Sequence, residues 1–392
     1  MKKKSVSENI IRVENSILSL DKKSWDECAN PKGRDFNPFV GYEFLKALEL
    51  SGSVNGESGW LTSYITLLDD KNYLKGCIPS YIKYNSMGEY VFDYSWAEAY
   101  TRIGGSYYPK IQISIPFTPA TTQKLLTASD DLDNKIKTNL VSGIYDVTKN
   151  LGCSSAHITF ISETEAKFLK ELGWLIRTDQ QFHWNNYHYR DFQDFLDALS
   201  SRKRKNIKKE RSSALKNSVN IEILHHKDIK TSHWDHFFNF YINTSMRKWG
   251  HPYLTREFFA MIGDNMSENI LLIMAKRKNQ YIAGALNFIG KNILYGRNWG
   301  ALEDHKYLHF EVCYYQAIEY AIKNNLKRVE AGAQGPHKIT RGYEPQITHS
   351  AHWIQDLNLS NAVSEYLKDE RKYIQENINI LSGYTPFKKN KF

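Results

Sequence analysis

The stretch "RKNQYIAGALNFIG", Arg277 to Gly290, decides the fold that the sequence predicts. It contains a polar turn, a short β-prone pair, a glycine and an apolar run, which together are typical of a β-hairpin. The same order occurs earlier in the chain, in "DDKNYLKGCIPSYI", Asp69 to Ile82. Similarity between two distant segments indicates a repeated structural unit. The alternative is two unrelated hairpins, because this order of elements is common.

The segments that follow the two hairpins also correspond. A strand with a tryptophan comes next, "YVFDYSWAEA" around Trp96 and "ILYGRNWGALED" around Trp299. An amphipathic helix and a further strand then follow, in residues 144–161 and 317–333. Strands alternating with helices predict an α/β fold. We therefore expect mixed sheets in two tandem, duplicated domains.

The remaining segments set the expected domain boundaries. We predict an N-terminal extension at 1–36, a first domain at 37–190, a basic linker helix at 191–218 and a second domain at 219–392. The second domain ends in a helix at about 360–381. The first domain opens on a helix, because Asn37 is a favourable N-cap and Pro38 suits a first helical position.

Composition limits the classes of function. The 392 residues carry a net charge of +9, which favours an anionic partner such as a nucleic acid, a phosphorylated cofactor or an acidic lipid. The four cysteines form no CxxC pair, which is typical of reduced cytosolic thiols. We expect a cytoplasmic protein without a signal peptide, a membrane span or a metal site. Its oligomeric state cannot be inferred from the sequence.

The segment "SSRKRKNIKKERSSALKN", Ser200 to Asn217, is the most charged part of the chain. A dense Lys/Arg helix can neutralise phosphates, so it is a candidate for binding tRNA or a nucleotide cofactor. A solvated linker helix is the ordinary alternative. The candidate anion-binding residues are Arg202, Lys203, Arg204, Lys205, Lys208 and Lys209.

Two strand-to-helix junctions are candidates for binding a ligand. The first, "IPFTPATTQKLL", is expected to enter a helix through Thr118, and the second follows the strand that carries Arg297 and Trp299 and enters a helix near His309. Helix N-termini present unpaired N–H groups that bind pyrophosphate or a carbonyl oxygen. Simple capping is the alternative. Neither junction has a P-loop or a dinucleotide-binding glycine motif.

The loop "RVEAGAQGPHKITRGYEP", Arg328 to Pro345, follows a buried strand. Acyl transfer to an amine needs a base for the ammonium proton and donors for the developing oxyanion. Glu330 or His337 is the candidate base, and Lys338 and Arg341 are candidate clamps for a carboxylate or phosphate. Gln334 and Gly335 are further candidate binding residues. A salt-bridged turn is the alternative.

Several of these motifs, in order, resemble the FemAB-like predicted N-acyltransferases. The resemblance rests on "NPFVGYEFLKALELSGSV", "GEYVFDYSWAEAY", "YYPKIQISIPFTPAT", "SSRKRKNIKKER" and "LHFEVCYYQAIEYAI" with the glycine-rich loop. It covers about residues 37–387. That family is related to the peptidoglycan-bridge aminoacyltransferases and belongs to the GNAT superfamily. The resemblance implies two tandem GNAT-like domains.

Individual residues match the family pattern to different degrees. Glu330 and Gly332 match its strand end, His337-Lys338 occupies the place of an aromatic-Lys pair, and Gly342 matches its closing glycine. His337 departs from the usual aromatic, so its role as a base is inferred from its chemistry alone. The first domain lacks a counterpart of the loop and is expected to shape the acceptor groove.

The sequence therefore predicts an N-acyltransferase that moves an acyl or aminoacyl group to an amine. The donor is acyl-CoA or aminoacyl-tRNA, and the acceptor is a peptidoglycan precursor or a small metabolite. The alternative is a non-catalytic protein that binds RNA or a cell-wall precursor through a decayed acyltransferase site. The sequence leaves the choice of donor and acceptor open.

Overall fold

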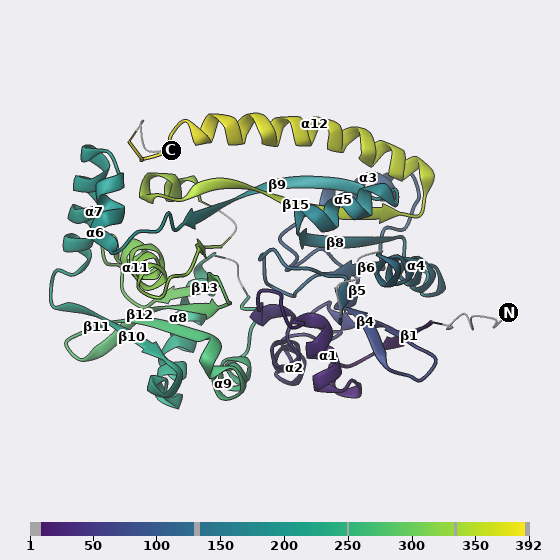
Figure 1. The fold of residues 1–392 in the computed structure, drawn as a ribbon, viewed down its shortest axis with the longest axis horizontal. Helices are drawn as coiled ribbons and strands as arrows, with labels where there is room; N and C mark the ends of the chain where they lie inside the picture. Colours follow the sequence, from purple (N-terminus) through teal and green to yellow (C-terminus); the bar gives the residue numbers. More distant parts are fainter. Residues whose placement is uncertain (1–8, 129–133, 249–250, 333–334, 389–392) are drawn as a thin grey trace. The chain divides into compact units, whose positions relative to one another are not determined.

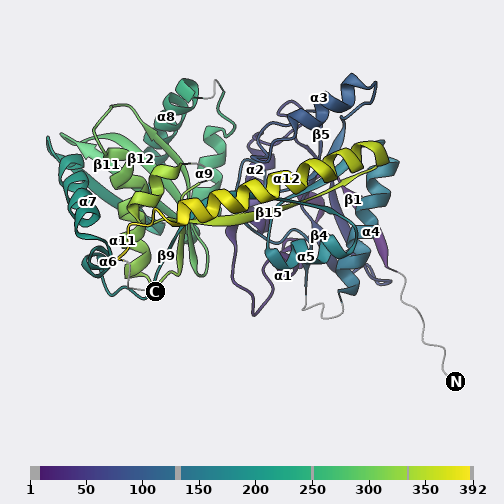
Figure 2. The same cartoon turned by 90° about the horizontal axis from the view of Figure 1, so that it is seen from above.

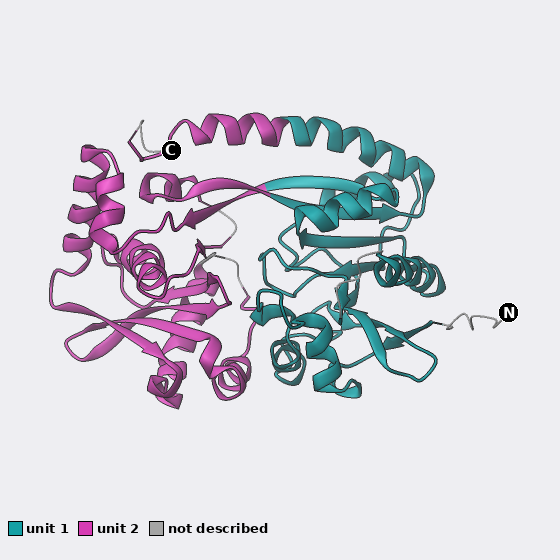
Figure 3. Cartoon of the chain, viewed as in Figure 1, with its two compact units in different colours: residues 1–179, 348–372 teal, residues 180–347, 373–392 magenta. Residues whose placement is uncertain are grey.

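The computed structural model describes residues 9–128, 134–248, 251–332 and 335–388 (Figure 1). The chain forms two compact units (Figure 3), with residues 1–179 and 348–372 in unit 1 and residues 180–347 and 373–392 in unit 2. Three elements have residues in both units: β9 (Leu175–Asn185), β15 (Glu344–Ile354) and α12 (Leu357–Ser382), the long yellow helix of Figure 2. Residues 348–372 thus group with unit 1, although the predicted second domain included them.

The strands of unit 1 form two sheets. The first has the order β1-β3-β4-β7, with β1 (Ile10–Glu14), β3 (Tyr64–Leu68), β4 (Leu74–Ile78) and β7 (Leu126–Thr127). The second has the order β2-β5-β6-β8-β15, with β2 (Leu61–Thr62), β5 (Ser80–Lys83), β6 (Lys110–Ile113) and β8 (Ser155–Ile161). In this second sheet β6 and β8 are parallel, whereas β5 and β15 are antiparallel to their neighbours.

Helices pack against both sheets of unit 1. The helices are α1 (Lys22–Ala29), α2 (Tyr42–Leu50), α3 (Tyr94–Arg102), α4 (Lys135–Asn150) and α5 (Glu163–Glu171), with 3₁₀ turns η1 (Ile17–Ser19) and η2 (Pro38–Val40). Ile144 of α4 packs with Ile111 and Ile158 of the sheet. On the other side, Trp96 of α3 packs with Val363 of α12. The amphipathic pattern of each helix is thereby matched to one sheet face.

Unit 2 contains one sheet with the order β10-β11-β12-β13-β14-β9. Its strands are β10 (Val219–His225), β11 (Ile270–Arg277), β12 (Gln280–Ile289), β13 (Ile293–Ala301), β14 (Arg328–Glu330) and the end of β9. β11 and β12 form the predicted hairpin, and Lys278 and Asn279 both have positive φ in its two-residue turn. β13 and β14 are parallel, and their neighbours β12 and β9 are antiparallel to them. This succession repeats that of unit 1, as a duplication predicts.

The helices of unit 2 lie on both sides of its sheet. They are α6 (Phe192–Ala198), α7 (Ser201–Ala214), α8 (Thr231–Lys248), α9 (Arg256–Asn265), α10 (Leu308–Phe310), the π-helical turn η5 (Glu311–Tyr315) and α11 (Gln316–Lys323), with 3₁₀ turns η3 (His226–Asp228), η4 (Ser267–Asn269) and η6 (Pro336–Arg341). Ile318 of α11 packs against Ala285 and Val329 in the main core. α8 packs on the other face, where a Cβ at Gly300 would lie 2.2 Å from the carbonyl group of Phe240. Only glycine allows this approach.

Two secondary-structure predictions for unit 1 are wrong. The residues around Trp96 form α3 and not a strand, because Trp96, Ala97 and Tyr100 have helical spacing and pack together in one core. The segment after β6 forms no helix at Thr118. There the Glu165 carboxylate accepts hydrogen bonds from the backbone N–H groups of Lys124 and Leu125, so tertiary contacts fix an irregular path.

Among the described residues, no helix is both long enough and apolar enough to cross a bilayer.

Candidate functional site

Two parallel strands of unit 2 separate at the centre of the sheet. β13 pairs with β14 only through Ile293–Tyr295 and Arg328–Glu330, although β13 continues to Ala301. From Gly296 onward, this edge of β13 therefore has no strand beside it among the described residues. The other edge carries a bulge, since Asn287 faces Gly296 and Leu286 faces Asn298, which leaves Arg297 as the extra residue. The separation leaves backbone groups of β13 available to a ligand.

A pocket of about 110 Å³ lies at this separation. Its lining comes from β12, β13, the start of the following helix and the residue after β14. The lining residues are Ala285, Leu286, Asn287, Gly296, Arg297, Asn298, Trp299, His309, Cys313, Tyr314 and Ala331. Three residues predicted to bind the donor, Arg297, Trp299 and His309, are thus brought together in one cavity.

The helix that closes the pocket begins in an unusual way. It passes from α10 into η5, a single π-helical turn, before α11 continues as a regular helix. Such turns often occur at functional sites. The Glu311 carboxylate in this turn is fully buried and accepts hydrogen bonds from Arg211 at 2.9 Å and Gln316 at 2.7 Å. This carboxylate anchors the helix start to α7.

Aromatic rings connect the pocket to the glycine-rich loop. The His309 ring lies 5.2 Å from the Trp299 ring and 5.2 Å from the Tyr314 ring, measured between centroids. The Tyr314 hydroxyl is 3.0 Å from Nε2 of His337, which is itself exposed. Partial burial and the neighbouring Arg341 lower the pKa of His337, so this imidazole is neutral at pH 7. His337 therefore reaches the pocket through Tyr314.

Glu330 lies at the end of β14 and is buried. Burial raises the pKa of its carboxyl group to about 7, against the opposing effect of Arg328, whose guanidinium lies 3.4 Å from Oε1. Its Oε2 has no hydrogen-bond partner among the described residues. A carboxylate of this pKa is suited to accept a proton near neutral pH.

His183 is a buried histidine that no sequence motif indicated. It faces Glu330 across the β9–β14 pair, with 4.0 Å between Nδ1 and Oε1. Burial lowers the pKa of His183 to about 3, so the ring beside the carboxylate is neutral. The two residues are 147 positions apart (330 − 183) and meet only through strand pairing. The strand pairing alone identifies His183 as a neighbour of Glu330, because no sequence motif includes it.

The two basic residues of the loop are already engaged. Lys338 is 1% exposed and donates a hydrogen bond from Nζ to the carbonyl of Gly332 at 2.9 Å; burial lowers its pKa to about 8. Arg341 donates to both carboxylate oxygens of Glu210 and to the carbonyl of His337. Both side chains therefore hold the loop in place. Gly335 precedes η6 with φ +119°, and the predicted Gln334 lies outside the described residues.

The segment predicted as one basic linker helix at 191–218 contains α6 and α7, and the charged residues of α7 divide into two groups. Glu210 and Arg211 turn inward and pair with Arg341 and Glu311. Arg204 pairs with Asp197 at 2.6 Å. The other candidate anion-binding residues form no ion pair within the part of the chain that the structure describes. These are Arg202, Lys203, Lys205, Lys208 and Lys209.

Thr118 belongs to unit 1, whereas the other candidate site residues belong to unit 2. Its hydroxyl is buried and donates a hydrogen bond to the carbonyl of Pro116 at 3.0 Å. The structure therefore brings the other described loop and strand candidates into one unit and leaves Thr118 in a local turn.

Unit 1 has a buried cluster of ionisable side chains. Lys110 lies 2.7 Å from Asp93 and 3.2 Å from Glu89, and Asp93 also accepts a hydrogen bond from Tyr107 at 2.6 Å. Lys83 lies near Glu89 with its ammonium over the ring of Trp60. Two carboxylates thus face two ammonium groups, and these charges compensate one another within the unit.

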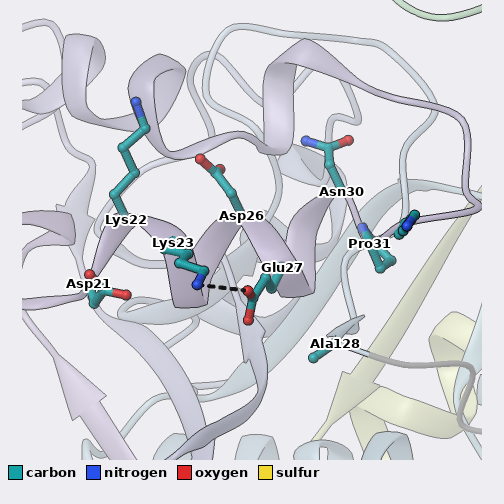
Figure 4. Close-up of a pocket in the computed structure, with 9 residues that line it drawn as sticks. Asp21, Lys22, Lys23, Asp26, Glu27, Asn30, Pro31 and Ala128 are labelled. Atoms are coloured by element: carbon teal, nitrogen blue, oxygen red, sulfur yellow. Dashed lines mark ion pairs between the residues drawn. The ribbon is translucent and has the colours of Figure 1, made fainter.

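Unit 1 also has a hollow of about 700 Å³ along α1 (Figure 4). Charged side chains surround it, among them Asp26 and the pair Lys23–Glu27, whose nitrogen and oxygen lie 4.0 Å apart. Lys23 and Glu27 are mostly exposed. We assign no site to it.

Comparisons with known proteins agree with this architecture. A model of the FemAB-like family, described as peptidoglycan biosynthesis/recognition, matches residues 16–389. The crystal structure of FemX superposes with a TM-score of 0.53 at 11% identity, covering 91% of this chain and 100% of FemX. The C-terminal domain of a putative lysylphosphatidylglycerol synthetase from Agrobacterium fabrum superposes with a TM-score of 0.50 at 7% identity, covering 87% and 95% of the two chains. No curated protein matches the sequence. The predicted α/β fold class with two similar units is confirmed, and the chain shares its fold with FemX.

Proposed function

Since the chain belongs to the FemAB-like family, we propose that it is an N-acyltransferase whose donor site is the pocket between β13 and Ala331 of unit 2. The donor is an activated acyl or aminoacyl group on a phosphate-bearing carrier, acyl-CoA or aminoacyl-tRNA. The acceptor is an amine on a peptidoglycan precursor, in keeping with the family description, or on a small metabolite.

The observation that carries the proposal is the separation of the two parallel strands. Because β14 ends at Glu330, the edge of β13 beyond Tyr295 can hydrogen-bond to a ligand that enters between them. Backbone N–H groups on a rigid strand are suitable donors to the oxyanion that forms when an amine attacks a carbonyl. The rings of Trp299 and His309, packed edge to face, provide an aromatic wall for the acyl group.

Glu330 is the proposed general base. It accepts a proton from the acceptor ammonium, directly or through one water, and its pKa of about 7 supports this role. The free amine then attacks the acyl carbonyl and forms the C–N bond, while the thioester or ester bond breaks and the carrier leaves as the thiol or hydroxyl after taking up a proton. His183 stays neutral beside it and limits the solvation of the carboxylate. His337 is the other candidate base, and its contact with the Tyr314 hydroxyl supports a role at the wall of the pocket.

Lys338 and Arg341 have a positioning role in this proposal. Their hydrogen bonds to Gly332 and to Glu210 hold the loop that follows Glu330. The exposed basic face of α7 supports binding of the phosphates of the carrier, because Arg211 and Glu210 fix that helix beside the loop.

A transfer assay tests the proposal. The protein is incubated with acetyl-CoA or alanyl-tRNA, and with a soluble peptidoglycan precursor peptide or a panel of small amines, and products are identified by mass spectrometry. We expect one donor to be used and Glu330→Gln to lower kcat/KM by about 10²- to 10⁴-fold. Glu376→Gln, which removes an exposed carboxylate of the same unit, is the control.

The alternative, a non-catalytic RNA- or precursor-binding protein, gives different results. It predicts no product with any donor and no effect of Glu330→Gln on function in cells. It also predicts loss of that function when the exposed basic residues of α7 are replaced by alanine. The acyltransferase proposal requires both changes to impair function.

A further inference from the structure

Asn287 is a buried polar residue in the pocket that the sequence did not single out. It lies on β12, is 1% exposed and faces Gly296 across the β12–β13 pair. Both residues line the cavity at the strand separation. A buried amide needs hydrogen bonds for both its nitrogen and its oxygen.

In the side-chain amide of Asn287, only the nitrogen has hydrogen-bond partners among the described residues. Nδ2 lies 3.4 Å from the carbonyl oxygens of Leu271 and Ala285 and donates to them. These two acceptors also fix the orientation of the amide, because the reverse orientation would place Oδ1 against two carbonyl oxygens. Oδ1 has no hydrogen-bond partner among the described residues. It is an unused acceptor in a cavity.

The space beside Oδ1 is kept open by Gly296. A Cβ at this position would lie 3.4 Å from Asn287 Oδ1, 3.4 Å from the carbonyl oxygen of Glu330 and 3.5 Å from Cα of Ala331. These are ordinary contact distances, so an alanine would fit and would cover the oxygen. The glycine at position 296 therefore leaves no side chain between the buried Oδ1 and the backbone of Glu330 and Ala331.

The charge of the lining indicates which donor suits this oxygen. Among the described lining residues, Arg297 carries a fixed positive charge and none has a carboxylate. An ammonium bound beside Oδ1 would lie near the like charge of Arg297, which disfavours it. A neutral amide N–H supplies the missing hydrogen bond to Oδ1 without this repulsion.

We infer that Asn287 Oδ1 binds a neutral amide N–H of the ligand, so that the pocket takes a group containing a primary or secondary amide. The inference deepens the proposed function, on which its meaning for acyl transfer rests. Asn287 is then a specificity-determining residue, since a site built to pair a hydrogen bond rejects an isostere that lacks it.

Small amides test the inference without any transfer assay. The probes are N-methylacetamide, its N–H-free analogue N,N-dimethylacetamide, and methylammonium. Their affinities are measured by ligand-observed saturation-transfer NMR on the full chain. We expect the wild type to prefer N-methylacetamide over each of the other two probes by about tenfold, the size expected for one hydrogen bond to a buried group.

Variants of Asn287 and Gly296 test whether the preference for N-methylacetamide depends on Oδ1. Asn287→Leu should abolish it, and Gly296→Ala should weaken it because the added methyl group covers Oδ1. Asn287→Asp should create affinity for methylammonium. Asn220→Ala, at an exposed position on β10, should leave all three affinities unchanged. Gly296→Ala serves as the second variant if Asn287→Leu does not fold.

Each of the following results would overturn the inference: equal affinity of the wild type for both amides, tighter binding of methylammonium, or an amide preference that survives both Asn287→Leu and Gly296→Ala. Absence of saturable amide binding would also overturn it. An amide preference in a protein that transfers no acyl group would leave this inference standing and remove the proposed function.

Discussion

Arg341 and Glu210 form a bidentate ion pair that joins the glycine-rich loop to the basic helix α7. Nη2 of Arg341 lies 2.8 Å from Oε1 of Glu210, and Nε lies 3.1 Å from Oε2. The guanidinium also lies over the Phe310 ring, 3.5 Å from its centroid. The loop that carries the candidate catalytic residues is thus fixed by a planar, nearly buried pair.

Removal of one partner should destabilise unit 2 strongly. Arg341→Met leaves the Glu210 carboxylate unpaired in a site where it is 17% exposed, and we expect a loss of about 2–3 kcal/mol in the free energy of unfolding. The double variant Arg341→Met/Glu210→Gln should recover part of this loss. Urea unfolding followed by tryptophan fluorescence measures both. The pair Arg190–Asp194 is a matched control, since Arg190 is 84% exposed and Arg190→Met should have no measurable effect.

Glu330→Gln should stabilise the fold at high pH. Burial raises the pKa of this carboxyl group from 4.5 to about 7, so the folded state binds its proton more tightly than the unfolded state does. The wild type consequently loses stability as pH rises from about 4.5 to 7, and the loss is complete above pH 7. Glutamine resembles the protonated acid, so the Glu330→Gln variant does not lose this stability. We expect a gain of about 2–3 kcal/mol at pH 8 and no gain near pH 4.

Thermal unfolding at several pH values measures this gain. The melting temperature of Glu330→Gln should exceed that of the wild type by about 5 °C at pH 8, and the two should converge at low pH. Glu376→Gln should melt like the wild type throughout. A Glu330→Gln protein less stable than the wild type at pH 8 would show that the carboxylate is compensated and is no candidate base.

The exposed face of α7 should control binding of a polyanion. Replacing Arg202, Lys205 and Lys209 with alanine removes three exposed cations without touching the inward pairs of Glu210 and Arg211. If each contacts a phosphate, the slope of log K against log salt for tRNA should fall in magnitude by about 2–3. Fluorescence anisotropy at several salt concentrations measures this slope. An unchanged slope would remove α7 from the donor site, and alanine at Lys368, Lys372 and Arg371 of α12 is the control.

The sequence predicted the parts of the fold that depend on local pattern. The hairpin at Arg277–Gly290 and the basic helix could be predicted because turn residues and hydrophobic periodicity are local signals. The segment around Trp96 was misassigned, because its aromatic residues favour a strand while the spacing of Trp96, Ala97 and Tyr100 is helical. At Thr118 the deciding contact, from Glu165, comes from a residue more than 40 positions away.

The sequence predicted only those site residues that lie close together along the chain. Arg297, Trp299 and His309 lie within one strand-to-helix connection, and the structure places them in one pocket. His183 and Asn287 were missed because their importance depends on strand pairing and burial, which leave no motif. The ion pair between Arg341 and Glu210 could likewise not be predicted from the sequence, because the two residues lie on separate elements.

Protection of Cys313 tests the central claim most directly. Cys313 lines the pocket and is partly exposed, whereas Cys28, Cys77 and Cys153 are buried and serve as internal controls in the same chain. Alkylation by iodoacetamide is followed by peptide mass spectrometry with increasing acetyl-CoA or alanyl-tRNA. We predict that the true donor slows Cys313 alkylation at least tenfold in a saturable manner and leaves the other three unchanged. Transfer of an acyl group from a donor that leaves the rate at Cys313 unaltered would contradict a donor site between β13 and Ala331.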